Sequence, residues 1–447
     1  MKKTCCTLLC VASLAASPLG VLAADVTVDS STLLGYGKRD VSGGSSETLA
    51  PATQFLGLTA DKLADGNLSL HLYGWGRADL ADNSFNSNTG DGSLTYGYLQ
   101  YRFTQAGAGI RAGRHFIHEG IVNEQVDGVS FRTDLPMGFG LSAFGGATVH
   151  TEDIGKDIQG KKTDGKGDTL YGGRINYRYK GMLDIGLSAV FESSPPTLVN
   201  PAPVTPLNGS YSRVGGDIWF TPFATVDIIG QSSYNTETSK IANHSYLLNY
   251  KPIPKLVLTG EYNHYSDSSY LYPRTSLSAR PLNPNDKSST AGFITSYEIS
   301  KNLEASLDYK HYSREFGSAD RFGGDLRVKY QDNSIRGGFG YHYLDAGQGF
   351  AITPYTSGSY QELRCYVMQD TKSYFGAVDI LGQFFKDDIY NESSAWETIA
   401  SLGYHITPAL ALSGDISYGK NPQFTEEVKG LLRLTYNMTY NGSGGKK

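Results

Sequence analysis

Apolar and polar residues alternate along most of this chain in segments of about 9 to 13 residues. In the segment LEASLDYKHYSR at 303–314, one parity holds Leu303, Ala305, Leu307 and Tyr309, and the other holds Glu304, Ser306, Asp308 and Lys310. The segments 321–330 and 169–179 divide in the same way. A period of two is that of a β-strand, whose successive side chains point to opposite faces. The alternation predicts strands with one apolar and one polar face.

The connections between these segments are alternately short and long. Turn formers such as Lys180-Gly181 and Thr407-Pro408 mark short ones, and longer polar loops are expected at 80–92, 150–167, 193–210, 266–288 and 345–358. This pattern is typical of a transmembrane barrel, in which one face of each strand meets lipid. We predict an all-β fold, a closed antiparallel transmembrane β-barrel of about 22 strands (20–24) without a plug domain. The expected strands are 31–41, 51–62, 67–79, 93–104, 108–117, 126–134, 139–149, 168–180, 182–192, 211–221, 224–235, 240–250, 256–265, 289–299, 303–314, 321–330, 334–344, 359–369, 373–386, 394–405, 409–419 and 427–440.

The first residues differ from the rest of the chain. Lys2 and Lys3 precede an apolar stretch, and Val21-Leu22-Ala23 is a small-residue cleavage pattern, so we expect a secretory signal peptide at 1–23. The barrel is then expected at 24–440 and a flexible tail at 441–447. Three of the four cysteines lie within the signal segment, which leaves Cys365 alone in the exported chain.

Composition narrows the class of protein further. The 447 residues include 53 Gly and 31 Tyr, and the formal net charge is −5. After residue 24 no apolar run approaches the roughly 18 residues that a membrane-spanning helix needs, which excludes a helical membrane protein. Because no basic block or basic tail occurs, nucleic acid is not an expected partner.

Two short motifs and the last strand extend this picture. The motifs are Gly113-Arg114-His115 and, a loop later, Val126-Asp127-Gly128-Val129-Ser130-Phe131, and the final segment alternates from Leu432 to Tyr440. With these features the chain resembles bacterial outer-membrane porins and porin-like channels, including the conduit proteins of metal-respiring bacteria. The resemblance implies an outer-membrane location. One feature departs from it, because such barrels commonly end on an aromatic residue, whereas Tyr440 is followed by seven more residues.

The polar parity supplies the candidates for the pore lining. Two stretches, 102–132 and 321–336, are mainly basic, and a third, 217–308, is mainly acidic. Opposed strips of charge would create a transverse field across the pore. The alternative is that these side chains are solvated and paired along the wall without any filtering role. The candidates are Arg102, Arg111, Arg132, Arg174, Arg178, Asp217, Asp227, Glu261, Glu298, Glu304, Asp308, Arg321, Arg327 and Arg336.

Motifs for catalysis and cofactors are poor, so we expect no enzyme, no catalytic residue, no cofactor and no metal site. His115, His118 and Glu119 offer three ligand types, but they lie where a strand is expected to pass into a loop, not on a helix. No Cys-x-x-Cys-His motif occurs, so we expect the chain to attach no c-type haem of its own.

Two functions follow from a barrel of this size. The first is a porin-like channel that gives small solutes or ions a polar conduit across the outer membrane. The alternative is the sheath of an electron conduit, which would hold a periplasmic or extracellular multihaem c-type cytochrome. Barrels of about 22 strands are usually plugged, and we expect only some seven residues between the cleavage site and the first strand. Inward-folded loops would therefore favour the channel, and a second protein in the lumen would favour the sheath.

Two local features complete the expectations. Cys365 shares its parity with Leu363 and Val367, which predicts that its thiol faces lipid. The loop from Ser193 to Ser210 contains five prolines and several apolar residues, so we expect it to fold over the pore mouth or to dock a partner. The pattern leaves the solute, the ion preference and the oligomeric state open.

Overall fold

The computed structural model describes residues 25–41, 46–64, 66–81, 90–149, 169–193, 210–237, 239–266, 287–314, 317–347 and 358–441. The expected signal segment, the residues after Asn441 and most of the proline-rich loop, 194–209, lie outside these ranges. Among the residues described, no helix is long and apolar enough to cross a lipid bilayer.

Nearly all of the described chain is β-strand, with two single-turn 3-10 helices, η1 (Thr104–Ala106) and η2 (Pro136–Gly138). The strands are β1 (Asp25–Val41), β2 (Ser46–Leu49), β3 (Pro51–Leu63), β4 (Leu68–Asp79), β5 (Gly90–Phe103), β6 (Ala108–Glu119), β7 (Val122–Asp134), β8 (Phe139–Thr148), β9 (Thr169–Tyr179), β10 (Leu183–Ser193), β11 (Ser210–Phe223), β12 (Val226–Asn235), β13 (Lys240–Ile253), β14 (Leu256–Tyr265), β15 (Ser288–Ser300), β16 (Leu303–Arg314), β17 (Gly317–Tyr330), β18 (Ile335–Ala346), β19 (Tyr360–Asp370), β20 (Tyr374–Ile389), β21 (Glu392–Thr407), β22 (Leu410–Asn421) and β23 (Phe424–Asn441).

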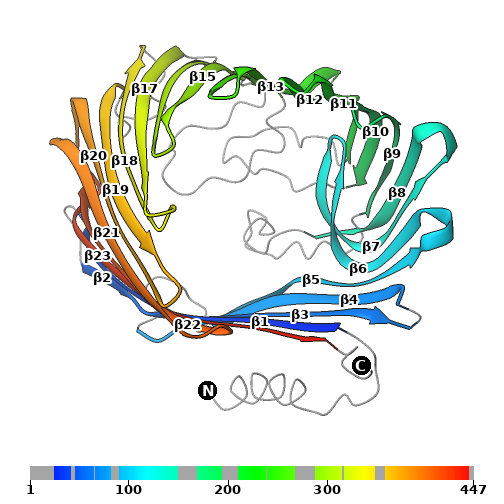
Figure 1. Ribbon diagram of the computed structural model, residues 1–447, viewed down its shortest axis with the longest axis horizontal. Coiled ribbons are helices and arrows are strands. Elements are labelled where there is room, and N and C mark those ends of the chain that lie inside the picture. The colour runs from blue at the N-terminus through cyan, green and yellow to red at the C-terminus, as the bar shows by residue number, and fades with distance from the viewer. Residues whose placement is uncertain are drawn as a thin grey trace, which may run out of the picture.

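The strands form one closed antiparallel ring (Figure 1). Each strand pairs with its neighbours in sequence, and β1 closes the ring against β23 from Asp25 opposite Asn441 to Val41 opposite Phe424. Both β2 and β3 pair with β1, one after the other, so they form a single wall strand that is interrupted at Ala50. Pro51, which lacks a backbone N–H, begins β3 at this break. Counting β2 and β3 together, the wall has the 22 strands that the sequence predicts.

The two faces of the wall differ as the alternation predicts. Large apolar side chains such as Leu187, Leu307 and Leu402 are 67%, 68% and 69% exposed on the outer face. In a soluble protein this apolar surface would have to be buried, whereas in a bilayer it meets the hydrocarbon. The residues of the other parity point into the ring, and many of them are charged.

Several predicted strand boundaries need correction. The short strand β2 is not among the expected strands, and β17 begins at Gly317, four residues before the expected start. β1 begins at Asp25, six residues before the expected start, and β23 runs to Asn441, into the expected tail. The largest difference is at 118–125, where we expected a loop. There β6 continues to Glu119 and β7 begins at Val122, so the two strands form a tight hairpin around Gly120 and Ile121.

Candidate functional site

The β6–β7 hairpin leaves the wall and folds into the lumen. β5 pairs with β6 only as far as Gly97 opposite Arg114, although β6 continues for five more residues. β7 also contacts β10, which is not its neighbour in the ring. In Figure 1 the cyan hairpin of β6 and β7 turns inside the ring, beside β9 and β10. We call residues 113–128 the inward hairpin.

Two glycines lie opposite each other where the inward hairpin departs. Gly113 on β6 pairs with Gly128 on β7. Gly113 has φ +122°, a conformation that favours glycine, and a Cβ there would overlap the Gly97 carbonyl oxygen. A Cβ at Gly128 would overlap the carbonyl oxygen of Gly145. Only glycine therefore fits both positions, where the backbone bends against its neighbouring strands.

The next pair of residues fastens the bend. Arg114 and Asp127 lie directly opposite each other, and two parallel hydrogen bonds of 2.7 Å join the guanidinium Nε and Nη2 to the two carboxylate oxygens. Arg114 Nη1 donates a third bond, of 3.0 Å, to the Leu94 carbonyl on β5. Such a bidentate, charge-assisted pair fixes geometry as well as adding attraction. The Gly-Arg and Asp-Gly motifs in the sequence are thus two halves of one bend.

Past the bend, the hairpin packs on the inner wall through apolar side chains. Ile117, Ile121, Val122 and Val126 are between 0% and 6% exposed. They form one buried cluster with Phe144 of β8, Leu170 of β9 and Val190 of β10. This contact removes apolar side chains of both the hairpin and the wall from the water of the lumen, which is favourable. It holds the hairpin against the wall.

Ion pairs hold the two sides of the tip. Glu124 Oε1 lies 3.4 Å from Arg213 Nη2 of β11, and Glu119 Oε1 lies 3.7 Å from Arg132 Nη1. Arg132 lies opposite Gly109 near the other end of the hairpin's own strands. The contact between Glu119 and Arg132 therefore shows that the tip folds back down the lumen.

The tip of the inward hairpin packs closely against a cluster of charged side chains on the wall, which contains Arg174, Asp184 and Asp217. A Cβ at Gly120 would overlap the Ser188 hydroxyl and would lie 3.1 Å from Arg174 Cδ and from Asp217 Oδ1. Arg174 Nε lies 2.8 Å from Asp217 Oδ1, and Arg174 Nη2 lies 2.9 Å from Asp184 Oδ1. Only 10% of the Arg174 side chain is exposed. Beside the tip lies a recess of about 510 Å³, whose lining also includes Trp219.

Most of the sequence-predicted pore-lining residues lie at the parity opposite to that of the exposed apolar side chains on their strand. Trp219 and Ile229, which are 39% and 44% exposed, are exceptions, because they share the parity of Asp217 and Asp227. Four acidic residues among the candidates have basic neighbours on nearby strands. Asp217 pairs with Arg174, Glu261 with Lys310 at 2.5 Å, Asp308 with Arg321 at 2.7 Å, and Glu304 with Arg327 at 3.3 Å. The acidic stretch therefore ends on β16 directly beside the basic stretch on β17. For these residues opposite charges lie side by side on nearby strands, and their role in filtering stays a prediction.

The remaining candidates are arranged differently. Arg178 lies 3.1 Å from Asp134 and 3.2 Å from Asp184. Asp227 accepts a hydrogen bond of 3.0 Å from Thr221, Glu298 lies opposite Glu304, and Arg336 lies opposite Lys329. These contacts do not bring the candidates into one site. Their role in lining a pore stays a prediction.

Three arginines gather on β5, β6 and β7. Arg102 and Arg132 both lie opposite Gly109, and Arg111 follows two residues later on β6. Arg111 donates a hydrogen bond of 2.9 Å to Gln100 and lies 5.8 Å above the Tyr98 ring. Within the described ranges neither Arg102 nor Arg111 has a carboxylate within 4.0 Å, so this part of the wall is basic.

The ligand set considered at His115, His118 and Glu119 does not converge. His115 is 1% exposed, and its ring binds the Gly113 carbonyl at 2.9 Å and the Ser130 hydroxyl at 2.8 Å. His118 is exposed, on the opposite face of the strand, and its ring stacks on Phe116. Sequence reasoning missed the inward hairpin, although one signal was present. Ile117, Val122 and Val126 are apolar at the parity that should face water.

No protein-family model matches the sequence, and no curated protein matches it either. Solved structures do match in fold. A variant of the ferric enterobactin receptor PfeA from Pseudomonas aeruginosa has a TM-score of 0.57 at 10% identity, over 92% of this chain and 80% of the receptor. The siderophore receptor PirA from Acinetobacter baumannii has 0.53 at 11%, with coverages of 92% and 80%. OccK11 (OpdR) from P. aeruginosa has 0.42 at 12%, with coverages of 93% and 96%.

At such low identities the likeness concerns the fold alone. The likeness to the two receptors, whose TM-scores exceed 0.5, agrees with the closed ring of 22 antiparallel wall strands. The outer face of this ring is apolar. A closed barrel leaves no unpaired backbone edge in the hydrocarbon, which is a requirement for a sheet that spans a membrane. The protein is a β-barrel of the bacterial outer membrane.

Proposed function

We propose that this protein is a passive channel that gives small hydrophilic solutes or ions a conduit through the outer membrane. The observation that carries the proposal is the inward hairpin. A 22-strand ring is wide, and a channel that discriminates by size needs something to narrow it. The hairpin does so from within the same chain, and it is held at the bend, by its apolar face and at its tip.

The chemistry of the lumen supports the same function. A hydrated solute loses some of its water on entering a narrow passage. Charged side chains on the wall, such as Arg111, Lys310 and Arg327, can contact the solute in place of that water. The proposal requires no catalytic step and no cofactor. We propose further that the hairpin, and not a separate plug domain, narrows this barrel, and that the fourteen sequence-predicted charged residues line the passage.

The alternative function, a sheath around a multihaem cytochrome, makes a different demand on the lumen. A protein partner needs a free inner wall over much of its length. The inward hairpin covers part of that wall, on β8 to β11, through Phe144, Leu170, Val190 and Arg213. This arrangement favours passage of solutes over occupation by a second protein.

One experiment distinguishes the two functions. The protein is purified from native outer membranes without crosslinking, and the same sample is used for an absorbance spectrum and for single-channel recording in planar bilayers. The channel predicts discrete conductance steps and no haem absorbance in the purified sample. Stoichiometric haem that co-purifies with the barrel, together with an absence of conductance steps, would support the sheath and refute the channel.

A further inference from the structure

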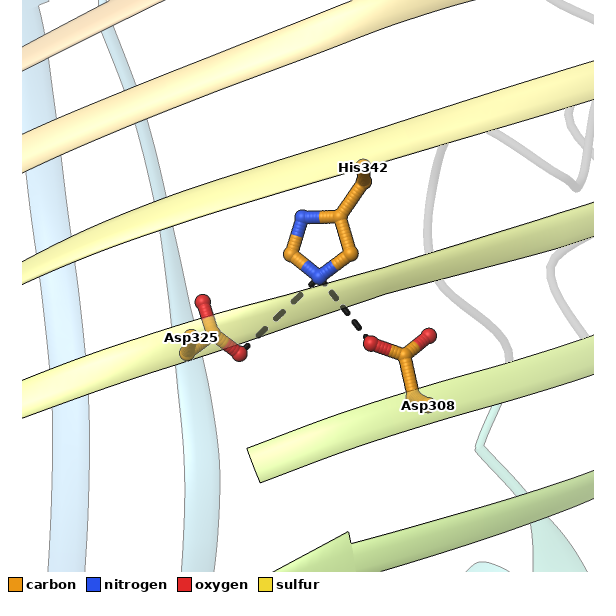
Figure 2. A group of neighbouring side chains, drawn as sticks. All are labelled: Asp308, Asp325 and His342. Carbon is orange, nitrogen blue, oxygen red and sulfur yellow. Dashed lines mark hydrogen bonds and ion pairs between the residues drawn. The ribbon is translucent and has the colours of Figure 1, made fainter. Parts of the chain in front are cut away.

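The inner wall of β16, β17 and β18 holds a cluster that the pore hypothesis does not explain. Asp308, Asp325 and His342 each offer one ligand atom, and these atoms lie within 4.8 Å of one another. Figure 2 shows the His342 ring pointing between the two carboxylates. Its Nε2 lies 3.0 Å from Asp308 Oδ1 and 3.9 Å from Asp325 Oδ2.

Two glycines make room for the cluster. Gly323 on β17 lies opposite Asp308 on one side and opposite His342 on the other. A Cβ at Gly323 would overlap the His342 ring, and Gly340 likewise leaves space for the Asp325 carboxylate. The three side chains therefore meet above a floor of bare backbone. This placement buries His342 and Asp308, whose side chains are 10% and 11% exposed.

The spacing suits a transition-metal ion. Nitrogen and oxygen ligands lie about 2.0–2.2 Å from Zn²⁺, which puts two ligands of one ion roughly 3.0–3.5 Å apart. The separation of 3.0 Å between His342 and Asp308 lies in this range. Asp325 lies slightly too far, but its side chain is 33% exposed and its Oδ2 accepts only a long bond of 3.4 Å from Ser306. A small rotation of Asp325 completes the set.

The surroundings match those of a ligating histidine. Such a histidine usually directs its other ring nitrogen toward a carboxylate, which orients the ring. His342 Nδ1 is buried, makes no hydrogen bond, and lies 3.8 Å from Glu362 Oε1. Arg321 binds Asp308 through Oδ2, which leaves Oδ1 free to face His342. The carboxylates of Asp308, Asp325 and Glu362 outnumber the one nearby guanidinium, that of Arg321. The group therefore has a net negative charge, which a divalent cation would offset.

We propose that Asp308, Asp325 and His342 bind one divalent transition-metal cation of the Zn²⁺ class on the lumenal wall, with Glu362 orienting the histidine. Imidazole and carboxylate ligands suit this class better than Ca²⁺ or Mg²⁺, which prefer oxygen ligands alone. Three protein ligands leave a coordination position open to the lumen. The site does not depend on what the barrel conducts.

The test is a titration of the whole purified barrel in detergent with Co²⁺, a spectroscopic substitute for Zn²⁺, after removal of metal with a chelator. We expect one equivalent of Co²⁺ to bind with visible absorption bands, and Zn²⁺ to displace it. Asp325→Asn, which keeps the shape of the side chain, should abolish saturable binding, as should His342→Ala. Glu362→Gln should weaken binding by about 10- to 100-fold, as other orienting groups do.

The matched control is His311→Ala. His311 lies on β16, 2.8 Å from Asp320, and so forms a histidine–carboxylate pair that no third ligand joins among the described residues. This variant should bind Co²⁺ as the unmodified protein does. Circular dichroism and the mobility of unheated samples on gels establish that each variant is folded. Absence of saturable binding by the unmodified barrel would overturn the proposal. Equal binding by folded His342→Ala would overturn it too.

Discussion

Gly113 and Gly128 lie directly opposite each other on β6 and β7, at the point where the inward hairpin leaves the barrel wall. Because a side chain at either position would overlap a backbone carbonyl, we expect Gly113→Ala to displace the hairpin and to raise single-channel conductance. The control is Gly260→Ala on β14, where a Cβ would meet nothing within 4 Å. A Gly113→Ala channel whose conductance equals that of the control would show that the bend does not depend on this glycine.

Arg174 is the residue of the tip region whose loss should cost the most stability. Arg174→Gln leaves Asp184 and Asp217 without their shared cation, and removing one partner of a buried pair costs about 3–5 kcal/mol. Arg364→Gln is the control, because Arg364 is 55% exposed and its pair with Asp379 is worth at most about 1 kcal/mol. Urea unfolding of both variants in lipid vesicles measures the difference. Equal losses of unfolding free energy would contradict the burial argument.

The arginines on β5 to β7 should influence ion preference. Arg111 has no carboxylate within 4.0 Å in the described part of the chain, so Arg111→Glu changes the local field by two charges without breaking an ion pair. We expect the reversal potential in a salt gradient to shift toward cation preference. Lys180→Glu, in the turn between β9 and β10, makes the same change of charge at a distance from the three arginines. It should shift the reversal potential less than Arg111→Glu does. An equal shift in both variants would mean that only net charge matters.

The register around Cys365 predicts a thiol that water-soluble reagents do not reach. Cys365 is exposed and lies opposite Phe339 and Ile380, which are 49% and 48% exposed on the outer face. A charged maleimide should leave Cys365 unlabelled in intact cells, because the lipid covers this face. Asp388→Cys near the end of β20, made in a Cys365→Ser background, is the positive control. Labelling of Cys365 at the rate of the control would place it outside the lipid.

The sequence predicts the wall well because alternation is a local property of each strand. The segment 303–314 shows its two faces without knowledge of its neighbours, and β16 occupies those residues. Contacts between distant strands are not local. Asp325 follows Asp308 by 17 residues, and His342 follows Asp325 by another 17. They come together only because Asp308 and His342 both pair with Gly323 on the strand between them. The inward hairpin was missed for a related reason, since Ile117 and Val122 find their apolar partners on β8 to β10.

The central claim is that the inward hairpin narrows the conduit. The direct measurement is the single-channel conductance of a barrel in which residues 117–124 are replaced by a two-residue Asn-Gly turn. This variant keeps Arg114, Asp127 and the full wall, and its barrel should remain closed because every wall pairing from β7 to β8 is retained. We predict that conductance rises above that of the unmodified protein and that larger solutes pass. Unchanged conductance and an unchanged size limit in the folded variant would contradict the account.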